Sequence, residues 1–266
     1  MKLDTQPAQA EPASFVPPSS ALVPKKPWIM RIGKQVQPRV NAIVASYSKI
    51  ANTPFQDTRQ FPWIATLEAH WREIQTEAAA ALENLDAIPP LAEISPDHRR
   101  IAPAGRWRSF FLYGYTYRVD ANCERCPRTA ALLAKVPGLN SALFSVLVPG
   151  THIPAHTGVT KAILTCHLGI RVPHEAERCR MRVADSSISW REGQAIVFDD
   201  TFEHEVLNDT DETRVVLLIQ FQRPARLIGR MVGGLFLWAV KHSRFVQEAR
   251  KGVIAWTEPK PAESSG

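Results

Sequence analysis

The sequence predicts an α+β protein with a mainly β core and helical flanks. After residue 140, short β-rich runs alternate with turns at Pro149–Gly150, Glu192–Gly193 and Asn208–Asp209, a spacing typical of an antiparallel barrel or sandwich. On both sides of this region apolar residues recur every three or four positions, which indicates amphipathic helices. The chain of 266 residues is 45% hydrophobic and 22% charged. This ordinary globular composition excludes a coiled coil or wholesale disorder.

The N-terminal part of the chain is expected to combine disorder, helix and loop. Residues 1–24 are rich in Pro, Ala and Ser, a composition that forms no packed core. Along the basic segment 25–52 the apolar residues lie opposite the cations, which predicts an amphipathic helix with Pro38 as a kink. A second helix is predicted at 64–84 by the same spacing. Shorter features are an extended stretch at 53–63, a Pro-rich loop at 88–103, an aromatic strand at 107–117 and a helix at 126–136 that ends at Pro137–Gly138.

The second half of the chain contains β-branched and aromatic runs that predict strands. These runs lie at 142–148, 162–172, 180–183, 187–190, 195–198, 204–207 and 214–222. We therefore expect a β core at 142–223 within one domain at 53–223. Residues 224–257 are expected to form basic amphipathic helices, and residues 258–266 a disordered tail.

Positive charge is concentrated in the two flanks of the chain. The sequence has 32 basic and 26 acidic residues, a net charge of +6. Between Ala13 and Gln56 there are six cations and no acid, and from Arg223 to Lys251 seven cations and one acid, so the flanks carry +12 and the rest −6. Cations interleaved with apolar residues favour an anionic membrane surface over nucleic acid, for which no stacking platform is present. We expect peripheral membrane contact through residues 25–50 and 223–251, with simple packing of both helices on the domain as the alternative.

Composition also indicates the compartment. Four cysteines are too few for a disulfide scaffold in a chain of this length. The longest apolar run, Met231 to Val240, is too short to span a bilayer, and the N-terminus lacks an apolar leader. We expect a cytoplasmic location, with peripheral contact to the inner membrane surface as an option. The single CxxC pair, Cys123 and Cys126, lacks the second pair that a zinc site would need.

Histidines are the candidate metal ligands. Five of the eight fall within the β-rich region. His156 follows a Pro-Gly turn, and His204 follows the strand AIVFDD 48 residues later, so strands that face each other in a jelly roll would unite the two side chains. Imidazole binds iron, zinc and copper, and the ligand type alone does not select the metal.

Two long stretches resemble a known family. They are SVLVPGTHIPAHTGVTKAILTCHLGI and WREGQAIVFDDTFEHEVLNDTDETRVVLLIQ, and both are similar to aspartyl/asparaginyl β-hydroxylases. The resemblance covers residues 142–223 and continues colinearly from about residue 53. It implies a double-stranded β-helix, or jelly roll, with flanking helices, and an oxygenase that depends on iron(II), 2-oxoglutarate and O2. Relatives in this family hydroxylate peptidyl aspartate or the acyl chains of bacterial lipids such as lipid A and ornithine lipid.

The resemblance also implies roles for individual residues. His156 and His204 match the two iron ligands and hence the catalytic centre. Arg214 matches the arginine that holds the distal carboxylate of 2-oxoglutarate, a task that suits a guanidinium because it pairs a carboxylate bidentately. Ser145 matches a hydroxyl beside that carboxylate, and His167 matches a histidine near the other end of the co-substrate. The turn NDTDE after the second iron ligand is expected to let Arg214 return along the neighbouring strand towards the same cavity.

Two positions depart from the pattern of the wider oxygenase class. Most such enzymes carry a carboxylate ligand two residues after the first histidine, where this chain has Gly158, as the peptidyl-aspartyl branch also does. Thr165 stands where relatives have an arginine near the first carboxylate of 2-oxoglutarate. Lys161 is expected an even number of residues away on the same strand and is a candidate replacement for that cation. Asp199 and Asp200 are expected either to cap a turn or to hydrogen-bond the metal-bound water or a ligand.

The resemblance predicts hydroxylation of an unactivated C–H bond. An acyl chain of a bacterial membrane lipid is the lead substrate, because the flanks are basic and amphipathic and no repeat module for gripping a protein is present. Peptidyl Asp or Asn is the alternative, which the HTG motif at 156–158 favours. A non-catalytic jelly roll that binds a metal or an acid is a further alternative, because Gly158 and Thr165 depart from the pattern.

Overall fold

The computed structural model describes residues 28–94, 100–101 and 105–257. The segments at 1–24 and 258–266 that were expected to be disordered lie outside these residues. The chain divides into two compact units, Met1–Val36 and Gln37–Gly266. Of the first unit the structure describes the start of helix α1 (Trp28–Ser46), and the second unit contains Pro38 inside that helix together with all other elements.

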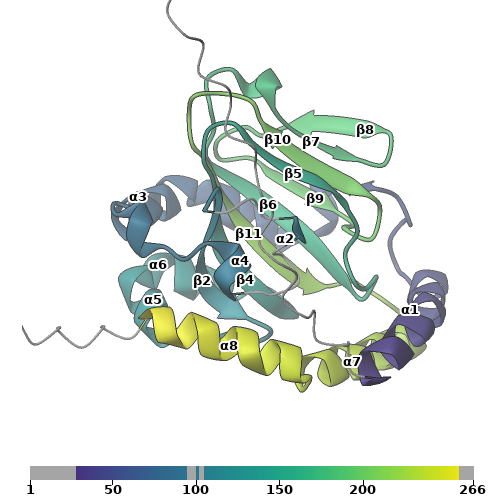
Figure 1. Ribbon diagram of the computed structural model, residues 1–266. Helices are drawn as coiled ribbons and strands as arrows, with labels where there is room; N and C mark the ends of the chain where they lie inside the picture. Colours follow the sequence, from purple (N-terminus) through teal and green to yellow (C-terminus); the bar gives the residue numbers. More distant parts are fainter. Residues whose placement is uncertain (1–27, 95–99, 102–104, 258–266) are drawn as a thin grey trace, which may run out of the picture. The chain divides into compact units, whose positions relative to one another are not determined.

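Two antiparallel sheets form the core of the second unit. The large sheet has the strand order β1-β9-β6-β11-β4-β2-β3, and the small sheet has the order β5-β10-β7-β8. From β4 onward the chain passes repeatedly from one sheet to the other, as Figure 1 shows. This arrangement is a double-stranded β-helix, and the expected fold is confirmed. The strands are β1 (Phe55–Gln56), β2 (Trp107–Gly114), β3 (Tyr117–Arg118), β4 (Leu139–Leu147), β5 (Thr151–His156), β6 (Ile163–Arg171), β7 (Cys179–Val183), β8 (Ser186–Ser189), β9 (Ala195–Phe198), β10 (His204–Asn208) and β11 (Arg214–Gln222).

Helices pack around this core and flank it in sequence. The helix expected at 64–84 is two helices, because the backbone of His70 leaves the helical region (φ −109°, ψ 15°). The helix expected at 126–136 is one helix over Pro127–Leu133, which begins at Pro127 because proline has a fixed φ and no N–H, and a separate short helix that was not expected precedes it at Asp120–Arg125. The remaining helices are α2 (Pro62–Ala69), α3 (Trp71–Ala81), α4 (Leu91–Ile94), α5 (Asp120–Arg125), α6 (Pro127–Leu133), α7 (Leu227–Lys241) and α8 (Arg244–Thr257).

Two features of the strands differ from the sequence expectation. The aromatic strand ends at Gly114 rather than residue 117, because Tyr115 and Thr116 have positive φ values of 49° and 69° and form a tight turn. Strand β5 was not expected at all. Its sequence, THIPAH, contains a proline and alternates weakly, so no β signal marks the strand that ends at His156.

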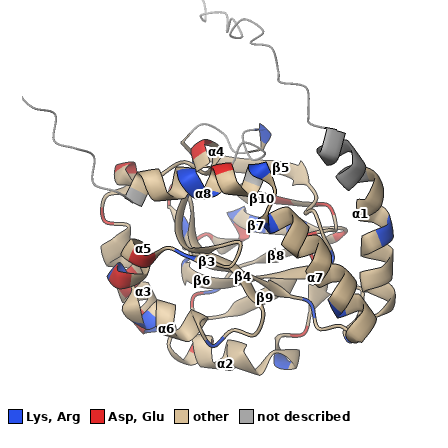
Figure 2. Cartoon of the chain, turned by 90° about the horizontal axis from the view of Figure 1, so that it is seen from below, with Lys and Arg blue, Asp and Glu red and all other residues tan. Residues whose placement is uncertain are grey.

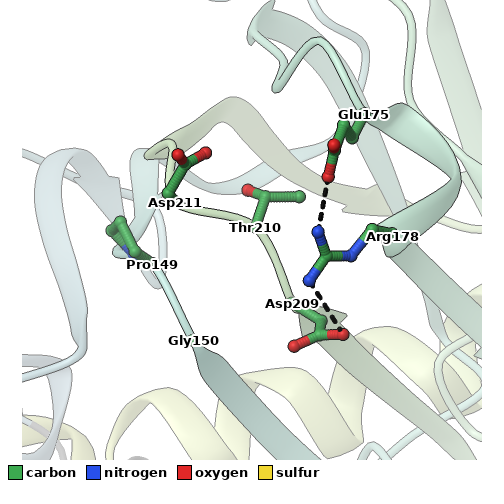
Figure 3. Close-up of a pocket in the computed structure, with 7 residues that line it drawn as sticks. All are labelled: Pro149, Gly150, Glu175, Arg178, Asp209, Thr210 and Asp211. Carbon is green, nitrogen blue, oxygen red and sulfur yellow. Dashed lines mark hydrogen bonds and ion pairs between the residues drawn. The ribbon is translucent and has the colours of Figure 1, made fainter.

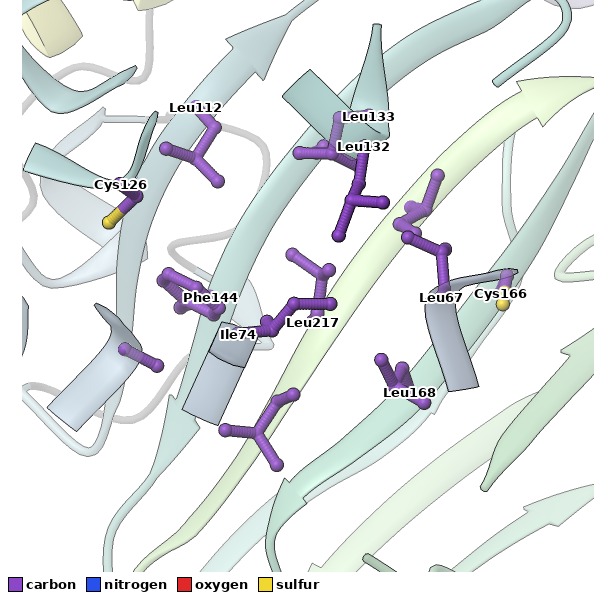
Figure 4. Close-up of a cluster of buried hydrophobic side chains, with 14 of the residues drawn as sticks. Leu67, Ile74, Leu112, Cys126, Leu132, Leu133, Phe144, Cys166, Leu168 and Leu217 are labelled. Carbon is purple, nitrogen blue, oxygen red and sulfur yellow. The ribbon is translucent and has the colours of Figure 1, made fainter. Parts of the chain in front are cut away.

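The hydrophobic core has two parts, one on each side of the large sheet. The outer part lies between that sheet and helices α2, α3 and α6, and Figure 4 shows Leu67, Ile74 and Phe144 within it. Cys126 belongs to this cluster, and burial raises the pKa of its thiol to about 12. The inner part lies between the two sheets and includes Trp190. The inner part therefore shares the interior of the β-helix with the polar residues of the candidate site.

None of the described helices combines the length and the apolar character that a bilayer-spanning segment needs.

Candidate active site

Two histidines meet at one end of the small sheet. His156 ends β5 and His204 begins β10, and the antiparallel register pairs the two residues directly. Their ring centroids lie 4.1 Å apart with an interplanar angle of 51°. The ladder has a bulge next to this pair: Val206 pairs with Ile153, so β5 contains one extra residue between the two pairs. The structure therefore brings together the two side chains that the sequence singled out.

Each of the two imidazoles forms one hydrogen bond to a backbone carbonyl through its Nδ1. The Nδ1 of His156 lies 2.8 Å from the carbonyl oxygen of Pro154, and the Nδ1 of His204 lies 3.0 Å from that of Phe202. A carbonyl only accepts, so each Nδ1 carries the hydrogen and each Nε2 keeps a lone pair. Burial is the main cause that lowers the pKa of His156 to about 4 and the pKa of His204 below its ordinary value. Neutral rings oriented in this way are suited to metal binding.

A carboxylate lies where a side chain at position 158 would be. A Cβ on Gly158 would fall 2.2 Å from Oδ1 of Asp200, and the amide of Gly158 donates to the backbone carbonyl of Asp200 at 2.6 Å. Thr165 Oγ1 donates to the same carboxyl group at 3.1 Å. Burial raises the pKa of Asp200 to about 7. Glycine at 158 thus leaves room for the carboxyl group of Asp200. This carboxyl group does not complete a three-ligand site, because the described residues contain no group of three His, Cys, Asp or Glu side chains placed to hold a metal.

Arg214 enters the interior from the opposite sheet. The expectation that it returns along the strand next to His204 is wrong, because β11 pairs with β4 and β6 of the large sheet whereas β10 pairs with β5 and β7. Its side chain is 1% exposed, and its Cζ lies 4.7 Å from the ring centroid of Trp190. Within the part of the chain that the structure describes, its Nε and Nη1 atoms have no hydrogen-bond partner. Burial lowers the pKa of this guanidinium to about 10.

Further polar side chains line the same interior. Ser145 on β4 is 2% exposed, and its Oγ accepts a hydrogen bond of 3.0 Å from Nε1 of Trp107. His167 on β6 is 6% exposed, and no described residue is a hydrogen-bond partner of either ring nitrogen. Its ring stacks at 6.0 Å from that of Trp190, and burial holds its pKa well below the ordinary value. Arg214 and His167 therefore share one aromatic neighbour inside the β-helix.

Lys161 does not lie on the strand with Thr165, since β6 begins at Ile163. Its Nζ forms an ion pair of 2.8 Å with Oδ2 of Asp199, and Arg223 binds the same oxygen. The other oxygen of Asp199 accepts from the amide of Thr201 at 3.0 Å, which caps the turn before His204. Lys161 is thus paired with a carboxylate that it shares with Arg223, and its role toward a co-substrate stays a prediction.

The donor set fits the groups that the resemblance implies. A buried cation without an anionic partner is costly, and its cost is removed when a carboxylate binds to it. Arg214 is such a cation, and the neighbouring hydroxyl of Ser145 and the two unpartnered nitrogens of His167 are polar atoms available to the same ligand. The paired imidazoles are neutral nitrogen donors of the kind that bind iron(II). The residues present therefore fit both a metal ion and a dicarboxylate.

The surface hollow shown in Figure 3 lies elsewhere. It is lined by the turn at Pro149 and Gly150 and by Asp209, with Arg178 forming ion pairs to Glu175 and Asp209. These turns adjoin the end of the β5–β10 ladder that is opposite to the histidines, where Asn208 pairs with Thr151. The hollow contains none of the candidate site residues.

Sequence reasoning missed two residues of the interior. Trp190 covers the guanidinium of Arg214, and Ser109 on β2 pairs in register with Ser145 while its own Oγ has no partner. Trp190 is the first residue of the second stretch that resembles the family, but the sequence assigned it no role, and Ser109 lies outside both stretches. The register between β2 and β4 places Ser109 in the interior, and the path of the chain after β8 places Trp190 there.

Fold and site together define a class of protein. It is a double-stranded β-helix with two adjacent neutral imidazoles on the small sheet and a buried guanidinium on the large one. The family model described as Aspartyl/Asparaginyl beta-hydroxylase matches residues 68–224. The chain belongs to this family, which confirms the resemblance seen in the sequence, and its relatives are hydroxylases.

Individual relatives differ in how much of them this chain covers. The chain is 36% identical over 218 residues to the ornithine lipid ester-linked acyl 2-hydroxylase of Rhizobium tropici, an alignment that covers 82% of this chain and 78% of the relative. It is 31% identical over 166 residues to the human aspartyl/asparaginyl beta-hydroxylase. This alignment covers 60% of this chain but 21% of the human protein. A Cupin 2 conserved barrel domain protein from Salinispora arenicola aligns with a TM-score of 0.30 at 13% identity, over 51% of this chain and 85% of that one. This score is too low to indicate a closer relationship.

Proposed function

We propose that this protein is an iron(II)- and 2-oxoglutarate-dependent hydroxylase. His156 and His204 would hold the iron, while Arg214 and Ser145 would bind the distal carboxylate of 2-oxoglutarate. His167 would contact the co-substrate as well. The single observation that carries this proposal is the guanidinium of Arg214, which is buried in the interior and has no anionic partner among the described residues.

The proposed cofactors define the chemistry, and the chain defines where it occurs. Bound iron(II) and 2-oxoglutarate would supply the oxidising power that places one atom of O2 on carbon and the other in succinate, with release of CO2. The carbonyls of Pro154 and Phe202 orient the two imidazoles through Nδ1. Trp190 shields the guanidinium of Arg214 from water. These residues bind, orient and exclude solvent, which is the protein's share in cofactor chemistry.

An acyl chain of a membrane lipid is the substrate that we propose. The relative in Rhizobium tropici acts on such a chain according to its name, and this chain covers 78% of it. Gly158 and the human relative favour peptidyl Asp or Asn as a second candidate. The two candidates differ in what must reach the histidines, a flexible hydrocarbon or a peptide backbone.

The test of the metal site compares the two candidate ligands with a third histidine. His204→Ala and His156→Ala should abolish binding of a reporter metal such as cobalt(II), followed by its visible spectrum, and should abolish succinate release. His152→Ala is the matched control, because His152 lies on β5 as His156 does but is exposed and bonds Glu205 at 3.3 Å. Equal cobalt binding by all three variants would refute the metal assignment.

Substrate choice is tested separately from the metal. An amino-acid-containing acyl lipid and an Asp/Asn-containing peptide are each incubated with iron(II) and 2-oxoglutarate, and products are examined by mass spectrometry. Gain of one oxygen atom by the lipid supports the proposal, and gain by the peptide alone transfers the function to the peptide branch. Absence of both, together with no oxygen consumption, would indicate a non-catalytic binding protein.

A further inference from the structure

Helix α7 is apolar around most of its circumference, and only one side of it is covered. Gly229 and Gly233 are its buried positions, and a Cβ on Gly233 would fall 2.9 Å from the Cβ of Ala162. Val44 of α1 and Ala162 form a small cluster with this side of the helix. The small glycine residues allow this close approach, so the inner side of α7 is firmly packed.

The outer side of α7 carries large apolar residues that nothing in the described structure covers. Leu227, Met231, Leu235 and Trp238 are 61%, 64%, 69% and 60% exposed. They succeed one another at intervals of four, four and three residues and therefore lie on one face of the helix. Ile228 beside them is 49% exposed. We call these five residues the outer face of α7. Half of the exposed large hydrophobic residues in the described part of the chain belong to it.

The outer face is attached to the segment that leaves the candidate iron site. Residues 157–162 follow His156 directly and pack beneath α7 through Ala162. The same segment is bound to the second half of α1, since Gln37 donates to the carbonyl of Val159 at 2.7 Å. Val159 itself is 58% exposed and adds a further apolar side chain. A surface that contacts the outer face would therefore lie beside the chain segment that carries Gly158.

The charge around the outer face is positive. Arg226 and Arg230 at its N-terminal end and Arg244 beyond its C-terminal end are exposed, and no carboxylate pairs with them in the described residues. From Arg226 to Lys251 the chain holds six cations and one acid, Glu248, and Figure 2 shows this excess of blue over red on α7 and α8. A second copy of the chain would bring these cations against each other. An anionic surface complements them.

We propose that the outer face of α7 docks on the surface of an anionic lipid bilayer. An apolar helix face flanked by Arg and Lys is the arrangement of helices that lie in the interface plane of a membrane. Trp238 near the end of the face suits the level of the lipid headgroups. The idea deepens the proposed function by bringing lipid acyl chains to the site, but the docking itself requires neither iron nor turnover.

The experiment measures vesicle flotation of the full chain without iron and without 2-oxoglutarate. Vesicles contain phosphatidylglycerol, and a second set contains phosphatidylcholine alone. The intact protein should float with the anionic vesicles and at least tenfold less with the neutral ones, and added salt should release it. Leu235→Ser with Trp238→Ser should weaken partitioning at least tenfold. Because both side chains are exposed, the melting temperature should be unchanged, which shows that the variant is folded.

Two charge variants locate the electrostatic part of the surface. Arg226→Gln with Arg230→Gln should weaken vesicle binding about tenfold or more, since each cation near an anionic lipid surface contributes about a fivefold factor. Arg180→Gln with Arg191→Gln removes the same charge from the β7–β8 region and is the matched control, expected to bind as the intact protein does.

The proposal is supported if the intact protein floats with anionic vesicles and if both the Leu235/Trp238 variant and the Arg226/Arg230 variant lose this binding. Failure of the intact protein to bind anionic vesicles overturns it, and so does equal binding by the Leu235/Trp238 variant. A third result is that the intact protein is a dimer, the Leu235/Trp238 variant is a monomer, and neither protein binds vesicles. In that case the outer face is an interface between copies of the chain, and the proposal is overturned. Since no turnover is measured, none of these results depends on whether the hydroxylase proposal holds.

Discussion

Replacing Arg214 by methionine should increase the stability of the ligand-free protein. The same replacement should abolish binding of 2-oxoglutarate. The guanidinium is 1% exposed, lies against Trp190 and has two nitrogens without a partner. Methionine has a similar length and fills irregular apolar space, so the packing is kept while the buried charge is removed. Replacing a buried charge by an apolar side chain is often neutral or stabilising.

The magnitude can be worked out from the pKa of the group. Burial lowers the pKa of Arg214 from 12.5 to about 10, which corresponds to a cost of about 3.4 kcal/mol for keeping the charge. Loss of the contact between the guanidinium and Trp190 offsets about 2 kcal/mol of this gain. The variant should therefore be more stable by about 1.4 kcal/mol, which raises the melting temperature by about 3 to 6 °C in a chain of this size.

The assay is thermal unfolding of the metal-loaded protein with and without 2-oxoglutarate. At a concentration one hundred times its Kd a ligand stabilises the protein to which it binds by about 2.7 kcal/mol. The intact protein should gain this amount, and Arg214→Met should gain none, so the order of the two melting temperatures reverses when 2-oxoglutarate is added. Arg178→Met is the control, because Arg178 is an exposed residue paired with Glu175 and Asp209 and its loss should change stability little.

Two results would refute this reasoning. A variant that unfolds well below the intact protein in the absence of ligand would show that Arg214 already has an anionic partner. A variant that is still stabilised by 2-oxoglutarate would show that the carboxylate binds elsewhere.

Two further predictions concern the surroundings of the site. Burial raises the pKa of Asp200 from 3.8 to about 7, so between these values the folded chain keeps a proton that the unfolded chain releases, and this contribution to stability is lost as pH rises. Asp200→Asn cannot titrate, so its stability relative to the intact protein should rise by about 3 kcal/mol from pH 4 to pH 7 in urea unfolding with chelator, and a constant difference would contradict this. Gly233→Ala should destabilise by about 1–3 kcal/mol because its Cβ would press on Ala162 at 2.9 Å. Gly234→Ala, which has open space, should stabilise the same helix by up to about 1 kcal/mol, and equal effects of the two alanines would disprove the packing of α7.

The sequence predicted the β core well because its strands carry strong local signals. The run at 214–222 is nearly all apolar or β-branched and became the central strand β11. Strand β5 shows the opposite case, since THIPAH has a proline and few β formers and is a strand only because β10 pairs with it. Helix boundaries also failed where tertiary contacts decide them, as at His70 between α2 and α3.

The candidate site could be predicted in part for a similar reason. His156, His204 and Arg214 stand in long motifs, and motifs can be read from sequence alone. Trp190 begins one of these stretches without an assigned role and Ser109 lies outside them, and both join the interior through strand register and the crossing between sheets. The role suggested for Lys161 rested on its parity with Thr165, but parity has meaning only inside a strand, and β6 begins at Ile163 after it.

The two imidazoles receive unequal support from the sheet that carries them. β10 is bonded on both sides, by β5 and β7, whereas β5 is the outermost strand and is bonded by β10 alone. Pro154 in that outer strand offers no N–H, which guards an open sheet edge against pairing with another chain. Outer strands fray before inner ones. Opening of this edge would carry His156 away from an ion while His204 stayed in place, so release of iron would begin at β5.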